Sequence, residues 1–170
     1  MARVFCIVVS TLFFLSCTTT RVEKTDNGII VHVKQDDSHA VKTIRLNVID
    51  NNIIHVSAIP GKKFSGEKSL ILQPGLKRSG TFSVHEKEDE VTLSTDSLDV
   101  IIRKSTGEIA FLNKRGEYIL QENSGGGKTF IPIEVEGTKG YTVHQLFESP
   151  DDEAFYGLGQ HQADDFNYKG

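Results

Sequence analysis

Cysteine, tryptophan, proline and methionine are scarce in this chain. Its 170 residues include two Cys, four Pro, one Met and no Trp. The two cysteines, Cys6 and Cys17, both lie near the N-terminus. The remainder of the sequence therefore offers no thiol for a disulfide or a zinc–thiolate site. A chain of this length buries enough surface to fold as one domain without such staples.

An excess of positive charge is also missing. Lys and Arg number 19 against 23 Asp and Glu, which gives a formal net charge of −4. A nucleic-acid-binding surface needs basic side chains that displace phosphate counterions, so we expect no nucleic-acid partner. With 25% charged and 38% hydrophobic residues, the composition is that of an ordinary globular domain rather than a disordered or collagen-like chain.

Motifs of the common catalytic and cofactor sites are absent as well. The six His residues are scattered and include no i, i+4 pair typical of a zinc helix. The glycines at 125–127 lack the spacing of a phosphate-binding loop, and no Ser lies in a nucleophile elbow. The acidic runs at 151–153 and 164–165 are more typical of solvated loops than of glycosidase carboxylates, which need a fixed separation. We expect no catalytic residue, metal or cofactor in this chain.

The N-terminus has the pattern of a signal peptide. Arg3 precedes a run from Val4 to Leu15 that is apolar except for Ser10 and Thr11. This run is too short for a transmembrane helix but suits the apolar region of a signal peptide. We expect residues 1–16 to be removed; a buried core segment is the alternative.

Cys17 closes a sequence, Phe14-Leu15-Ser16-Cys17, that resembles a bacterial lipobox. We expect lipidation of Cys17, a membrane anchor and a periplasmic or outer-membrane location in the cell envelope. Ordinary cleavage without lipid, which would give a secreted protein, stays open. Residues 17–27 are mostly polar and aperiodic, and they predict a flexible tether between membrane and fold.

From residue 28 onward the sequence predicts an all-β domain. Short runs with period-two alternation are bounded by turn residues, and β-branched residues dominate them. The expected strands are 30–33, 41–48, 53–59, 82–86, 91–95, 98–104, 108–113, 117–121, 130–137 and 142–149. Gly107 and Gly116 mark hairpin turns that make 98–121 an antiparallel meander, and 124–127 is a glycine-rich loop. Many short strands at this spacing favour an antiparallel β-sandwich over residues 28–170.

The C-terminal stretch combines aromatic, glycine, amide and imidazole groups. Aromatic faces with planar hydrogen-bonding side chains suit sugar rings, which makes this stretch a candidate carbohydrate site. A glycine-bent strand whose aromatic residues pack in the core is the alternative. The candidate sugar-binding residues are Gln160, His161, Gln162, Asn167 and Tyr168, and the structural motif before them is Tyr156, Gly157, Leu158 and Gly159.

The letters FYGLGQHQADDFNYKG at 155–170 closely resemble the segment that closes the N-terminal β-sandwich of family 31 glycoside hydrolases, in their α-xylosidase and α-glucosidase branches. The resemblance implies a galactose-mutarotase-like sandwich. It also implies that hydrolysis is the work of two Asp on a following (β/α)₈ barrel, with retention of configuration. This chain has no barrel, so we expect a truncated, non-catalytic carbohydrate-binding or scaffold domain. Its full-length parent would cleave α-xylosides or α-glucosides and bind oligosaccharide through the barrel.

Two other functions stay open at this point. One is a free-standing carbohydrate-binding lipoprotein. The other is a structural interaction domain whose exposed apolar edge needs a protein partner.

Overall fold

The computed structural model describes residues 22–66, 73, 75, 80–157, 159 and 167–169. The predicted signal peptide, residues 1–16, and the predicted lipidation site, Cys17, lie outside these residues. Their roles stay predictions.

One antiparallel sheet is built from the first four strands, in the spatial order β1-β2-β3-β4. Its strands are β1 (Val22–Thr25), β2 (Gly28–His32), β3 (Thr43–Asp50) and β4 (Ile53–Ile59). Successive side chains of β3 point to opposite faces of this sheet. Ile44, Leu46 and Val48 point into the core. Arg45 and Asn47, which lie between them, point outward and are half-buried.

The second sheet has five antiparallel strands in the order β5-β6-β7-β8-β9. They are β5 (Ser83–Glu86), β6 (Glu90–Ser94), β7 (Leu98–Arg103), β8 (Ile109–Asn113) and β9 (Tyr118–Gln121). The last three form the meander that the sequence predicted, with turns at Gly107 and Gly116 that have φ values of 74° and 82°.

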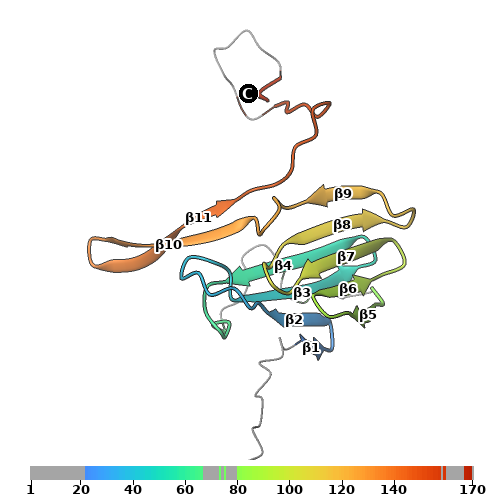
Figure 1. Cartoon of the computed structure of the whole chain (residues 1–170), viewed down its shortest axis with the longest axis horizontal. Coiled ribbons are helices and arrows are strands. Elements are labelled where there is room, and N and C mark those ends of the chain that lie inside the picture. The colour runs from blue at the N-terminus through green and yellow to red at the C-terminus, as the bar shows by residue number, and fades with distance from the viewer. Residues whose placement is uncertain are drawn as a thin grey trace, which may run out of the picture.

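The two sheets pack face to face (Figure 1). A single core cluster joins Ile29, Ile44 and Leu46 of the first sheet to Leu93 and Ile102 of the second. All five are fully buried. The prediction of an all-β antiparallel sandwich is therefore confirmed, and its stability rests on apolar burial between the layers.

The predicted tether is wrong where it overlaps the described chain. Residues Val22–Thr25 form β1, an edge strand paired with β2 in the register Val22↔Val31 to Thr25↔Gly28. The signal for this hairpin was the Asp26-Asn27-Gly28 turn, and Val22 packs against the core. This segment, with three polar residues out of four, forms a strand because β2 offers its backbone hydrogen-bond partners.

A third, two-stranded sheet is a hairpin that projects from one end of the sandwich (Figure 1). Its strands are β10 (Lys128–Val135) and β11 (Thr138–Gln145). The predicted turn position is wrong, because β11 begins at Thr138 instead of Thr142. The two-residue turn Glu136-Gly137, with φ values of 49° and 78°, joins the strands directly.

Within the described residues, no helix has the length and hydropathy to cross a membrane.

Candidate functional site

The aromatic residues of the C-terminal motif lie on the surface. Tyr156 is 69% exposed and Phe155 is 41% exposed, so the alternative in which they pack in the core is wrong for both. Gly157 and Gly159 have φ values of 94° and 93°, which only glycine adopts easily, and each faces open space. Leu158, Gln160, His161 and Gln162 lie outside the described residues.

Asn167 and Tyr168 are brought back beside Phe155. The side-chain oxygen of Asn167 accepts hydrogen bonds from the backbone N–H of Phe155 at 2.9 Å and of Lys169 at 3.1 Å. The backbone N–H of Tyr168 donates to the carbonyl of Phe155 at 2.9 Å. In this structure Asn167 is a clip that holds residues 167–169 beside Phe155.

Exposed large apolar side chains are concentrated on β9, on the projecting hairpin and just after it. It is called the β9–β11 surface below. Its members are Tyr118, Ile119, Leu120, Ile131, Ile133, Val135, Tyr141, Val143, Leu146 and Phe147. Beyond Phe130 both faces of the hairpin are exposed, although a hairpin alone in water is marginally stable. Such a surface is typical of an interaction site.

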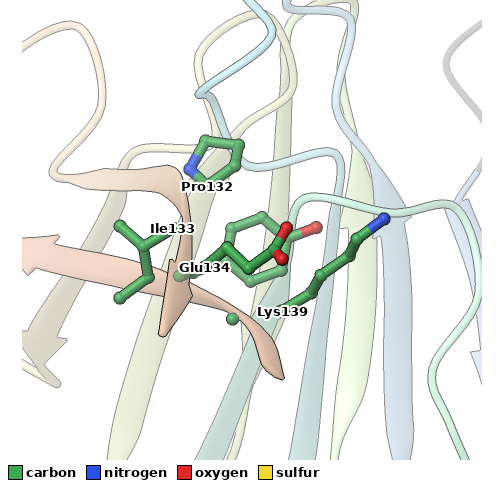
Figure 2. Close-up of a pocket in the computed structure, with 6 residues that line it drawn as sticks. Pro132, Ile133, Glu134 and Lys139 are labelled. Atoms are coloured by element: carbon green, nitrogen blue, oxygen red, sulfur yellow. The ribbon is translucent and has the colours of Figure 1, made fainter. Parts of the chain in front are cut away.

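A shallow groove of about 450 Å³ crosses the outer half of the hairpin. Glu134 and Lys139 are directly opposite one another across the strands, as are Pro132 and Tyr141. Figure 2 shows the side chains of Ile133 and Lys139 pointing in opposite directions from the hairpin. The Tyr141 ring meets the Phe130 ring edge to face, with centroids 6.1 Å apart, and this contact ties the exposed half of the hairpin to its buried root.

A second cleft, of about 490 Å³, opens where the hairpin joins the sandwich. Its walls are mainly apolar and come from strands of all three sheets. They include Val56 and Ala58 of β4, Phe111 and Leu120 of the five-stranded sheet, and Phe130, Val143 and Phe147 around the hairpin. The cleft is an opening into the sandwich core rather than a polar active site.

A buried ion pair forms the floor of this cleft. The Nζ of Lys128 contacts both carboxylate oxygens of Glu122, and the two residues are only 7% and 4% exposed. Glu122 also accepts hydrogen bonds from the backbone N–H of Ile109 and from the Gln145 amide, each at 3.1 Å. Burial lowers the pKa of Lys128, and the attraction of Glu122 opposes that shift. Because every partner is satisfied within the protein, the pair is structural.

The described residues assemble no catalytic constellation. Asp151, Asp152 and Glu153 are exposed in a turn, and Asp164 and Asp165 lie outside the described chain. Within the described ranges, no group of three or more His, Cys, Asp or Glu has metal-binding geometry. What this region provides is apolar contact area. The sequence had left open an exposed apolar edge, but it did not place that edge on β10 and β11, because their alternating pattern is also that of strands with one face covered.

Comparison with protein families gives a match over residues 43–170. The matching family is described as the glycosyl hydrolase 31 N-terminal galactose mutarotase-like domain. The match therefore covers β3 to β11 and the C-terminal motif.

Individual relatives agree with this match. An α-xylosidase of Saccharolobus solfataricus is 28% identical over 123 residues, which is 69% of this chain and 16% of that enzyme. The crystal structure of a GH31 α-xylosidase from Xanthomonas citri superposes with a TM-score of 0.71 and 37% identity, over 83% of this chain and 15% of that one.

A GH31 α-xylosidase from a soil metagenome, crystallised with xylose, shares the fold at a TM-score of 0.65 and 20% identity. It matches 89% of this chain, which spans 24% of that structure. The chain thus corresponds to a fraction, between about a seventh and a quarter, of these relatives.

Proposed function

Since this chain belongs to the family of glycosyl hydrolase 31 N-terminal galactose mutarotase-like domains, we propose that it is the non-catalytic scaffold domain of an α-xylosidase-like enzyme. In this proposal the parent enzyme hydrolyses α-xylosides or α-glucosides, and its catalytic residues follow the sandwich in the sequence. The relatives named α-xylosidase support the first substrate class over the second.

The observation that carries the proposal is the β9–β11 surface. Ten large apolar side chains are exposed on it, against three elsewhere among the described residues, Ile53, Phe155 and Tyr156. Uncovered apolar area of this kind is costly in water and typical of a face that packs against another domain. The catalytic part of the parent enzyme is the proposed occupant, and the cleft at the hairpin root would receive its side chains.

The experiment compares the chain alone with the chain in its proposed context. Residues 43–170 replace the matching segment of the Xanthomonas citri α-xylosidase, and hydrolysis of aryl α-xyloside and aryl α-glucoside is measured. We expect the 170-residue chain to be inactive and the chimera to hydrolyse the xyloside faster than the glucoside. Hydrolysis by the purified chain alone would overturn the non-catalytic role. A chimera that folds but does not turn over would overturn the scaffold role.

A matched pair of variants locates the contact. Val143→Asp, in the cleft at the hairpin root, should lower the activity of the chimera at least tenfold, because it places a charge against the apolar docking face. Ile53→Asp is the control. It places the same charge on an exposed residue at the start of β4, in the four-stranded sheet, and should leave activity within about twofold.

We also propose that the chain is anchored to the cell envelope through lipid on Cys17. The support is the lipobox-like sequence after an apolar N-terminal run. The Cys17→Ser variant should move from the membrane fraction to the soluble fraction. Equal membrane retention of both proteins would overturn the lipid anchor.

A peripheral carbohydrate role for Gln160, His161, Gln162, Asn167 and Tyr168 is retained as a proposal. Its support is the exposed position of Phe155 and Tyr156 beside Tyr168. Binding of xylo-oligosaccharide that is lost in Tyr168→Ala would support the free-standing carbohydrate-binding alternative. Undetectable binding at millimolar sugar would count against it.

A further inference from the structure

A separate groove lies on the outer face of the four-stranded sheet. Its volume is about 470 Å³, within the range of small-molecule sites. The outward residues of β1, β2 and β3 form its floor, and Lys62, Lys63 and Phe64, which follow β4, form its wall. The proposed function makes no use of this groove.

Arg45 is the central side chain of the groove floor. It stands directly opposite Ile30 in the strand register, and its guanidinium lies over the Phe64 ring with Cζ 4.2 Å from the ring centroid. Stacking on an aromatic face holds the planar fork of an arginine in place before a ligand arrives. The buried Nε of Arg45 makes no hydrogen bond in the part of the chain that the structure describes. A buried N–H donor without an acceptor is costly, so an acceptor that reached this guanidinium would be favoured.

The charge of the groove is positive. Arg45, Lys62 and Lys63 line it, and within the described part of the chain none of them forms an ion pair. Glu23 is the one acidic side chain among the lining residues, and its carboxylate is already engaged 3.2 Å from Nε2 of His32. Three cations thus converge on one hollow of a chain whose formal net charge is −4.

The remaining polar groups of the floor are held in place. The Thr43 hydroxyl donates to the carbonyl of Gly61 at 2.8 Å, which fixes the start of the loop that carries the two lysines. Nδ1 of His32 lies 3.4 Å from the same hydroxyl. The wall of the groove is therefore tied to its floor, and the cations are presented on a defined surface.

We propose that this groove binds an oxyanion, carboxylate or phosphate, carried by a sugar-sized molecule. The Arg45 fork supplies paired N–H donors that match the two oxygens of either group, and Lys62 and Lys63 add charge from the rim. A neutral sugar gains no attraction between opposite charges in this groove, so we expect it to bind far more weakly. The site does not depend on hydrolysis by a parent enzyme.

Calorimetric titration of the full chain at low salt tests the proposal. The probes are glucuronate, glucose 6-phosphate, glucose and inorganic phosphate. We expect saturable binding of glucuronate or glucose 6-phosphate, and the tighter of the two identifies the source of the oxyanion. Glucose should not bind, and 0.5 M salt should weaken binding at least fivefold because the rim charges are screened.

Three variants assign the site to its residues. Arg45→Gln should weaken binding tenfold or more, and Lys63→Gln, in an exposed loop, should weaken it several-fold without any effect on folding. Arg115→Gln is the matched control, because Arg115 lies in the turn between β8 and β9, outside the groove, and pairs with Glu117 at 2.8 Å. We expect this control to bind as the unaltered chain does.

Several results would overturn the proposal. One is the absence of saturable binding of either sugar anion. Equal loss of affinity in Arg45→Gln and Arg115→Gln would overturn the assignment to this groove. Equal affinity for inorganic phosphate and glucose 6-phosphate would overturn the assignment to a sugar-sized molecule.

Discussion

The charged side chains at the root of the hairpin show how polar groups are tolerated inside an apolar fold. Lys128 and Glu122 are both buried, yet each is fully engaged, and Gln145 and the Ile109 backbone take up the remaining capacity of the carboxylate. Two buried charges offset one another only as a pair. The pair fixes the start of β10 against Glu122, the residue that follows β9, and it thereby sets where the hairpin leaves the sandwich.

Removing one member of this pair should therefore be costly. Lys128→Met leaves a buried carboxylate without its cation, and we expect the free energy of unfolding, measured by urea denaturation, to fall by about 3 kcal/mol. The matched control is Lys114→Met, which breaks an exposed 2.8 Å pair with Asp99 and should cost less than about 1 kcal/mol.

The double variant Lys128→Met with Glu122→Gln should lose less stability than the sum of its single variants, by about 1 kcal/mol or more. Strict additivity would show that the two charges do not act as a unit.

Asn167, one of the proposed sugar-binding residues, also has a structural role in this fold. Its amide oxygen caps two backbone N–H groups, those of Phe155 and Lys169. We expect Asn167→Ala to raise the hydrogen-exchange rate of the Phe155 amide several-fold, whereas Asn167→Asp, which keeps the acceptor oxygen, should preserve its protection. Equal exchange in all three proteins would contradict the clip.

At the scale of elements, the two predicted turns of the meander differ in their surroundings. Gly107 and Gly116 each lie in a hairpin turn and each have a positive φ. A Cβ at Gly107 would lie 2.5 Å from Cγ1 of Val41 and 3.2 Å from Cδ1 of Ile44, whereas a Cβ at Gly116 would meet open space. The first turn is packed against the opposite sheet and the second is free.

Alanine substitution at the two glycines separates these effects. In both variants the left-handed backbone lowers the free energy of unfolding by about 1 kcal/mol. Gly116→Ala should lose only that amount, because its new Cβ meets open space. Gly107→Ala should lose about 3 kcal/mol in the free energy of unfolding, since the core side chains must also shift. The measurement is urea denaturation of both variants, and equal losses would show that the contact at Val41 is easily relieved.

At the scale of the whole molecule, the dominant feature is the β9–β11 surface. A chain that presents it to water should associate as its concentration rises. We expect the sedimentation coefficient of the chain to increase between about 10 and 200 µM. Ile133→Thr combined with Val135→Thr should reduce that increase, because both residues lie on one face of β10 and keep their β-branched shape. Ile53→Thr, exposed on β4, is the control and should change nothing.

Much of the architecture was determined by local sequence. Period-two alternation and turn residues specified the all-β class, the β7–β9 meander and the glycine-rich loop at 124–127, because strand faces and tight turns depend on neighbouring residues. The C-terminal letters alone indicated the family. The tether prediction was wrong over Val22–Thr25, and the β11 start was placed four residues late, because strand pairing depends on which backbone edge lies alongside.

Only the tertiary structure decided what the side chains of these strands do. Alternation cannot tell a face covered by a second sheet from one left bare, so the exposure of Ile131, Ile133 and Val143 was not readable from β10 and β11. Residues far apart in sequence, such as Glu122 and Gln145, or Arg45 and Phe64, acquire their roles when folding places them within contact distance. Short-range patterns fix local geometry, whereas burial and charge pairing are set by the packing of distant segments.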